Sequence, residues 1–197
     1  MLLHTCDLPT LKKGEAIGAL LEAQKAGKVR WLGYSGDNDA AAWAAARPEI
    51  AVVETSISIC DQANIEIVLP VARKHNVGVI AKRPIANAAW KDLSRQPGFY
   101  KGYAQPYTDR LGRMGLSPTD LGFSGPPEQA WPEIALRFTL SQKGVHTAII
   151  GTTRLENAVA NRNYAQKGPL RENVVRRIRE AFDAAEAASS SIWAGLG

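Results

Sequence analysis

The residues with the clearest chemical meaning are Gly151-Thr152-Thr153-Arg154-Leu155-Glu156-Asn157, which follow a strand-like run and open a helix-period segment. The first amides of a helix have no partner inside it, and the helix dipole places positive charge at the same end. A turn that ends a strand and starts a helix therefore predicts a phosphate-binding site. The structural alternative is that Thr153 is the N-cap and Glu156 completes a capping box, and both interpretations can hold together.

The elements around this turn alternate between strand-like and helix-period segments, which is typical of parallel strands joined by crossover helices. Predicted strands span residues 1–5, 29–35, 50–56, 78–83 and 147–151. Predicted helices span residues 13–26, 39–46, 64–75 with Asn64 as its cap, 128–140, 154–165 and 172–188. Such units fit either part of a (β/α)8 barrel or a doubly wound open sheet, and periodicity does not separate the two.

Residues 86–127 break the alternation, because they are dense in Gly, Pro, Tyr and Trp. The segment is too long for a simple connector, so we expect a functional loop with short helices that closes over the site. The sequence predicts one domain over residues 1–197, in which residues 172–197 form a last helix and a tail that frays from Ser189 onward.

Composition limits the class of protein. The chain is 45% hydrophobic and 22% charged, a composition that predicts a folded protein. Its length of 197 residues falls short of the roughly 250 residues of a complete (β/α)8 barrel. The net charge of +5 is scattered apart from Arg176, Arg177 and Arg179, which we interpret as a solvated helix face, so no nucleic-acid partner is expected.

Cysteine usage and hydropathy address the compartment. Cys6 and Cys60 are too few for a disulfide framework, and no cluster with metal-ligand spacing occurs, so no metal is expected. The N-terminus lacks the pattern of a signal peptide, and no run approaches 18 apolar residues. We therefore expect a cytoplasmic protein with no membrane partner.

Four stretches also carry a family likeness. They are LLHTCD at 2–7, GKVRWLGYS at 27–35, VIAKRPI at 79–85 and IIGTTRLEN at 149–157. In order and spacing they resemble strands four, five, seven and eight of the aldo-keto reductase family. The resemblance implies an α/β fold of the parallel (β/α)8 TIM-barrel type, here a partial barrel of about five strand-helix units that lacks the first three.

The resemblance implies NADP(H)-dependent reduction of an aldehyde or ketone, with NAD(H) as the alternative cofactor, and assigns His4 as a catalytic residue that polarises the carbonyl. A buried structural histidine is the alternative. The family's catalytic aspartate, tyrosine and lysine lie on earlier strands and have no matching position here. We therefore expect the chain to be truncated and inactive when isolated, with open strand edges that allow self-association.

The same resemblance assigns the residues that would bind the nicotinamide carboxamide. Ser35 matches the serine of the family's Gly-x-Ser-Asn turn, whereas Gly36 stands in place of the asparagine. Glu54 falls where the family usually has a glutamine, and an ionised carboxylate cannot donate. A solvated glutamate at a strand end is an equal alternative.

The resemblance assigns the remaining cofactor contacts to two segments. Lys82 replaces the family's stacking aromatic residue and would line the phosphate channel with Arg83, Ile85 and Asn87. A solvated basic rim is the alternative. The turn after the last strand would hold the adenosine 2'-phosphate and the adenine, through the set Gly151, Thr152, Thr153, Arg154, Asn157 and Asn161.

Two other functions remain open from the residues. One is a catalytically dead nucleotide-binding fragment or subunit, which keeps the phosphate turn but lacks the tyrosine and lysine. The other is a phosphate-binding isomerase or aldolase barrel, for which Lys82 would be the carbonyl-reactive amine.

Overall fold

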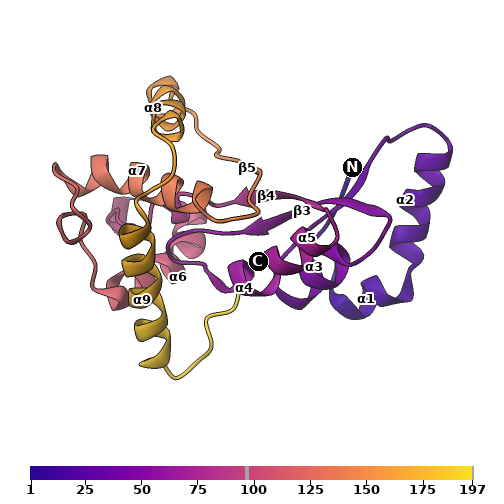
Figure 1. Cartoon of the computed structure of the whole chain (residues 1–197), viewed down its shortest axis with the longest axis horizontal. Helices are drawn as coiled ribbons and strands as arrows, with labels where there is room; N and C mark the ends of the chain where they lie inside the picture. The colour runs from indigo at the N-terminus through magenta and orange to yellow at the C-terminus, as the bar shows by residue number, and fades with distance from the viewer. Residues whose placement is uncertain (96–97, 197) are drawn as a thin grey trace.

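A computed structural model describes residues 1–95 and 98–196, and within them five strands form one parallel sheet (Figure 1). The strands are β1 (Leu2–His4), β2 (Leu32–Ser35), β3 (Ile50–Ser56), β4 (Gly78–Lys82) and β5 (Thr147–Ala148). Their order in the sheet is β1-β2-β3-β4-β5, each pair parallel. Sequential order is that of a barrel wall, since a doubly wound sheet reverses its strand order at a switch point. The partial-barrel prediction is therefore confirmed.

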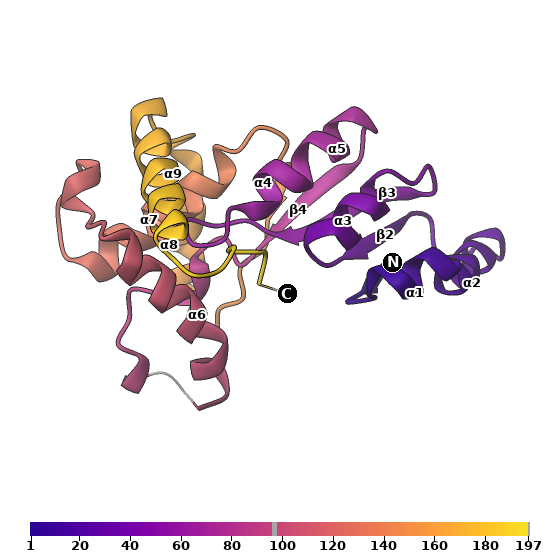
Figure 2. The same ribbon diagram turned by 90° about the horizontal axis from the view of Figure 1, so that it is seen from below.

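Helices lie between these strands in the chain and after the last one, and some of them pack against the sheet (Figure 2). They are α1 (Leu8–Lys13), α2 (Glu15–Lys25), α3 (Asn38–Ala45), α4 (Ala63–Ile67), α5 (Leu69–Lys74), α6 (Gly98–Met114), α7 (Pro127–Leu140), α8 (Leu155–Gln166) and α9 (Glu172–Ala187). Three 3-10 turns, at Ala86–Ala88, Leu93–Arg95 and Thr119–Leu121, complete the described elements.

Two helical regions differ from the prediction. The helix predicted over 13–26 is α2, and a short helix that sequence reasoning missed, α1, precedes it and ends at Gly14, whose φ is 81°. The helix predicted over 64–75 is divided at Val68, because Pro70 opens α5 as a new first turn. The prediction of Asn64 as a cap was wrong: α4 begins at Ala63, and Asn64 is buried with its amide directed elsewhere.

The segment 86–127 has more regular structure than the sequence predicts, since it contains the 17-residue helix α6. Buried Ala104, Tyr107, Leu111 and Met114 recur at three- and four-residue spacing and form one apolar stripe. The glycines and Pro106 of this helix conceal the stripe in the sequence, because both residue types normally interrupt helices.

The two faces of the sheet have different environments. Leu32, Val53 and Val79 are buried on the face toward the helices, with α3 and α5 contributing Ala41 and Ala72. The opposite face, which would line the barrel interior, carries alternate residues in register. One row is Leu2, Gly33, Val52 and Gly78, and the next is His4, Ser35, Glu54 and Ile80. The second row places predicted site residues side by side at the carboxyl ends of the strands.

The predicted fraying from Ser189 onward was wrong. Trp193 is only 6% exposed, and its ring centroid lies 5.0 Å from that of Phe182 in α9. The chain then turns back to the carboxyl ends of the strands, where its backbone is hydrogen-bonded (Figure 2). Burial of a large indole and satisfaction of the backbone groups hold a segment that its own composition would leave loose.

Candidate functional site

A cavity of about 650 Å³ lies between the end of β4 and the turn after β5. Its lining includes Lys82, Arg83, Ile85, Asn87 and Gly151. The predicted cofactor residues of two segments about 65 positions apart thus meet in one cavity, because adjacent parallel strands bring their carboxyl ends to the same edge. Phe99, Tyr100 and Tyr103 of α6 complete its wall.

A second cavity of about 320 Å³ adjoins the first, and Ile85, Ala88, Ile150 and Gly151 line both. It gathers Thr152, Asn157 and Asn161 from the turn and from α8, three of the residues predicted to contact the adenosine end of the cofactor. The two cavities therefore form one elongated depression that contains the predicted residues from Lys82 to Asn87 and, from the turn and α8, Gly151, Thr152, Asn157 and Asn161.

The turn before α8 differs in its capping from the structural alternative. The N-cap residue is Arg154, and the structure shows no side-chain capping bond at this described helix end, so the predicted capping box of Thr153 and Glu156 is wrong. Thr152 Oγ1 instead accepts from the Arg154 amide at 3.2 Å and from Asn157 Nδ2 at 3.4 Å. The side chain of Arg154 is exposed. The amides that start α8 thus remain available to an anion.

Lys82 has a partner that the sequence did not suggest, because its Nζ lies 2.9 Å from Asp37 Oδ2. Asp37 also accepts from the Ser56 amide at 2.6 Å, Thr55 Oγ1 at 2.9 Å and Asn64 Nδ2 at 2.9 Å. Burial alone would raise the pKa of Asp37, but the Lys82 charge and these hydrogen bonds outweigh it and lower that pKa. The ion pair holds the Lys82 side chain at the carboxyl end of β4.

Arg83 and Asn87 lie in a turn where Arg83, Ala86, Asn87 and Ala88 all have positive φ between 46° and 56°. Such backbone is costly without glycine, so surrounding contacts must hold it. Arg83 Nη1 donates to Tyr107 Oη at 3.3 Å and to the Leu196 carbonyl, and Asn87 Nδ2 donates to the Tyr103 carbonyl at 3.2 Å. The turn therefore orients Arg83 and Asn87, two of the polar side chains of the first cavity.

Ser35 is the last residue of β2, and Gly36 follows it. Ser35 Oγ is buried and has no hydrogen-bond partner among residues 1–95 and 98–196. A Cβ on Gly36 would lie 2.4 Å from Tyr34 Oη, whose hydroxyl donates to the Cys6 carbonyl at 2.6 Å. This contact explains why glycine stands where the resemblance expects asparagine.

His4 and Glu54 flank Ser35 in the same row of the sheet. His4 is exposed, contrary to a buried structural role, and its Nδ1 lies 2.7 Å from Thr5 Oγ1. Glu54 is half-buried. Neither side chain lines either cavity, and Ser35 does not line them, so the predicted carboxamide contacts of Ser35 and Glu54 lie outside the two cavities and stay predictions.

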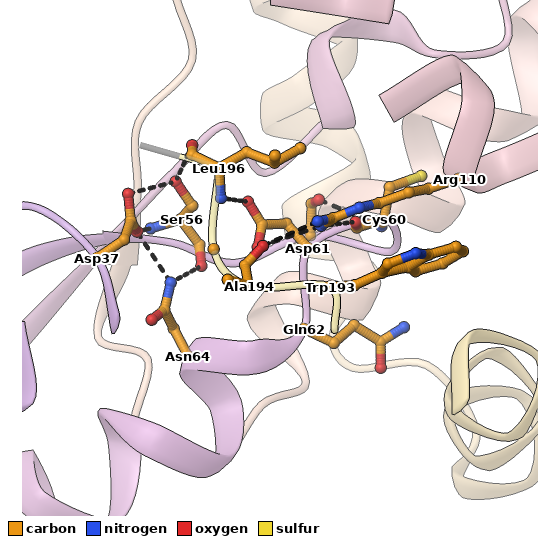
Figure 3. Close-up of polar contacts among 12 residues, drawn as sticks. Asp37, Ser56, Cys60, Asp61, Gln62, Asn64, Arg110, Trp193, Ala194 and Leu196 are labelled. Atoms are coloured by element: carbon orange, nitrogen blue, oxygen red, sulfur yellow. Dashed lines mark hydrogen bonds and ion pairs between the residues drawn. The ribbon is translucent and has the colours of Figure 1, made fainter. Parts of the chain in front are cut away.

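A buried polar cluster was missed by sequence reasoning. Asp61 Oδ2 accepts from Tyr107 Oη at 3.1 Å and from the Leu196 amide at 3.0 Å, while Arg110 Nη1 lies 3.9 Å from Asp61 Oδ1 (Figure 3). Burial raises the pKa of Asp61 to about 6, although these partners act in the opposite direction. No local pattern marks these residues, since they are 46 to 135 positions apart.

Two negative findings apply to the described residues. No group of three His, Cys, Asp or Glu side chains there could hold a metal ion. None of the helices in the described part is long and apolar enough to cross a membrane.

Comparison with known proteins was made for sequence and for structure. The family model described as the aldo/keto reductase family matches residues 1–107, more than half of the chain. Similar solved structures include an aldo-keto reductase from Bacillus halodurans in its holo form, at 24% identity and a TM-score of 0.68, covering 98% of this chain. The apo form of that protein has the same identity, TM-score and coverage of this chain.

This chain spans only 61% of the holo structure's length and 62% of the apo structure's length. At this identity the likeness concerns the fold. No curated protein sequence matches the chain.

Proposed function

Because the chain belongs to the aldo-keto reductase family, we propose that it forms the cofactor-binding side of an NADP(H)-dependent reductase that converts an aldehyde or ketone to an alcohol. The observation that carries the proposal is the meeting of Arg83 and Asn87 with the Gly151 turn in one elongated depression. Membership of this family also sets the isomerase and aldolase alternatives aside.

The residues of this depression and of the turn beside it suit a dinucleotide with two phosphate groups, a central pyrophosphate and a 2'-phosphate on the adenosine half. Arg83 offers a guanidinium for the pyrophosphate, and the uncapped amides of α8 with exposed Arg154 offer a site for a 2'-phosphate. The unpaired hydroxyl of Ser35 can donate to or accept from a carboxamide, whereas an ionised Glu54 can accept but cannot donate. When bound, the nicotinamide would supply the hydride.

His4 is the residue that we assign to polarise the carbonyl of the substrate. Its exposed imidazole at the end of β1 can donate to a carbonyl oxygen. The row of the sheet that contains His4, Ser35 and Glu54 holds no tyrosine that could donate the proton. The neighbouring Tyr34 donates to the Cys6 carbonyl, and burial raises its pKa to about 12. We therefore propose that the isolated chain binds cofactor with little turnover, which is also what a nucleotide-binding subunit would do.

Segment 86–127 is proposed as the lid of this site. Phe99, Tyr100 and Tyr103 are exposed at the start of α6 and line the first cavity, so movement of residues 98–103 toward the turn at Gly151 would enclose a ligand. Addition of NADPH should slow trypsin cleavage at Lys101; an unchanged rate at saturation would count against a lid.

The surroundings of the protein are proposed on similar grounds. Both cysteines, Cys6 and Cys60, are free, which suits the reducing cytoplasm. A small carbonyl compound is the proposed substrate and nucleic acid is not a proposed partner. Strands β1 and β5 are the edges of the sheet among the described residues, and such edges favour self-association.

Titration of NADPH and NADH onto the chain, followed by fluorescence, tests the cofactor proposal. We expect preference for NADPH, and Arg154→Ala should weaken NADPH binding about 5- to 30-fold, as loss of a charge-assisted contact does, while NADH is unaffected. Arg176→Ala, on the exposed face of α9, is the matched control. Equal NADPH affinities for wild type and Arg154→Ala would refute the phosphate assignment, and rapid turnover of an aldehyde panel would refute the proposed inactivity.

A further inference from the structure

The last described residues, Ile192–Leu196, form a strap that lies over the carboxyl ends of β2 and β3 (Figure 3). The backbone of the strap is held by hydrogen bonds to side chains from earlier in the chain. Asn38 accepts from the Gly195 amide at 2.7 Å and donates to the Gly195 carbonyl at 3.1 Å. Arg110 Nη2 donates to the Ala194 carbonyl at 2.9 Å, and Asp61 accepts from the Leu196 amide.

The groups that hold the strap are buried. Asp61 and Ser56 are 0% exposed and Arg110 is 8% exposed. A buried polar group without a hydrogen-bond partner destabilises the folded chain. Asp61, Ser56 and Arg110 therefore need partners, which can be backbone groups of the strap or a ligand with the same donors and acceptors.

Two strap residues make contacts that a substitution can remove. Trp193 packs against Phe182, and the Arg110 guanidinium lies 5.2 Å from the ring centroid of Trp193. Gly195 is in close contact with two side chains, because a Cβ at this position would lie 2.7 Å from Asn64 Nδ2 and 2.9 Å from Asn38 Oδ1. A methyl group at position 195 must therefore displace the strap or its partners.

The strap shares Arg83 with the first cavity. Arg83 lines that cavity, and its Nη1 donates to the Leu196 carbonyl, which Ser56 Oγ also contacts at 3.3 Å. An anionic ligand that uses the Arg83 guanidinium in this cavity therefore competes with the Leu196 carbonyl for it.

We propose that the strap is an autoinhibitory segment that must leave Arg83 before an anionic dinucleotide binds. The identity of that ligand as NADP(H) rests on the proposed function. If only the strap-released state binds, the observed dissociation constant exceeds the intrinsic one by the inverse of the released fraction. Weakening the strap then tightens binding without any new contact to the ligand.

The test measures NADPH affinity and amide hydrogen exchange on the full 197-residue chain. Trp193→Ala and Gly195→Ala should each lower the NADPH dissociation constant on the order of tenfold. In wild type, saturating NADPH should speed exchange at the amides of Gly195 and Leu196. Matched controls are Trp31→Ala, at a side chain that is 68% exposed, and Gly18→Ala, where a Cβ would meet no described atom within 4 Å.

The outcomes separate the strap from the proposed function. If NADPH binds but both strap variants keep the wild-type affinity and the two amides stay protected, the strap proposal is wrong and cofactor binding stands. If no variant binds NADPH, the cofactor proposal fails, and inorganic pyrophosphate becomes the probe of Arg83. Faster exchange at Leu196 with pyrophosphate would then support the strap, and unchanged exchange would overturn it.

Discussion

Helices α8 and α9 follow each other in the chain but differ in what supports them. The 16-residue α9 buries Val174, Ile178, Phe182 and Ala185 against the body of the molecule. The 12-residue α8 buries none of residues 155–166, all of which are described, and Leu155 is 75% exposed. In Figure 1, α8 projects away from the sheet whereas α9 lies beside α6 and α7.

The difference shows where stability and proposed binding are located. We call strands β2 to β4 with α3, α6, α7 and α9 the packed body, and residues 149–166 the α8 arm. The packed body holds the Asp37 and Asp61 clusters, while the α8 arm carries the turn proposed to bind phosphate. Few buried apolar contacts imply a low local free energy of opening, so cofactor binding should order the α8 arm more than the packed body.

The largest expected effect within the packed body comes from Asp37→Ala. The change leaves Lys82 without its carboxylate and removes the acceptor of Thr55, Ser56 and Asn64, so the free energy of unfolding should fall by about 3–5 kcal/mol. Urea denaturation measures the loss. Asp39→Ala is the control, since Asp39 is exposed in the first turn of α3. Equal losses for the two variants would mean that the Asp37 cluster does not stabilise the body.

A matched pair of apolar truncations tests the two helices directly. Ile178 is 0% exposed in α9, so Ile178→Ala should cost about 2–5 kcal/mol of unfolding free energy through lost burial and a cavity. Leu155→Ala in α8 should stay within about 0.5 kcal/mol, because that side chain is already in solvent. A large loss for Leu155→Ala would show that the α8 arm packs in solution as well as α9 does.

A further effect within the packed body depends on pH and arises at Asp61. Its pKa is raised from 3.8 to about 6 in the folded state, so the folded chain takes up a proton more readily than the unfolded chain. The resulting stabilisation is complete below about pH 4 and is lost as pH rises through about 6, with a maximum of about 3 kcal/mol. Asp61→Asn does not titrate, so the unfolding free energy of wild type minus that of the variant should decrease over this window. A constant difference from pH 4 to pH 7 would show that Asp61 is not perturbed.

Local patterns account for the parts of the fold that the sequence predicts well. The apolar stripe of α9 and the β-branched run of β3 determine their own secondary structure, because period and propensity are properties of short segments. The parallel order of strands then brings the ends of β4 and β5 together, which is why the predicted residues from Lys82 to Asn87 meet Gly151.

Other predictions failed where a distant residue decided the outcome. Asn64 has the residue type of a helix cap, but its amide bonds Asp37 and the Ser56 carbonyl, 27 and 8 positions away. The polar Ser189-Ser190-Ser191 run predicts fraying, yet Trp193 and Gly195 beyond it are held by α9 and Asn38. Neither partnership leaves a pattern within a short window.

The sequence by itself determined the five strands and the helices apart from α1 and α6, the turn at Gly151 and the placement of His4, Ser35 and Lys82 at strand ends. Only the tertiary structure decided that Lys82 pairs with Asp37, that Asp61 and Arg110 are buried together, and that Leu196 contacts Arg83. The physical reason is that backbone periodicity follows from neighbours in the chain, whereas a buried charge or carbonyl is stabilised only by the partners that folding brings within hydrogen-bond distance.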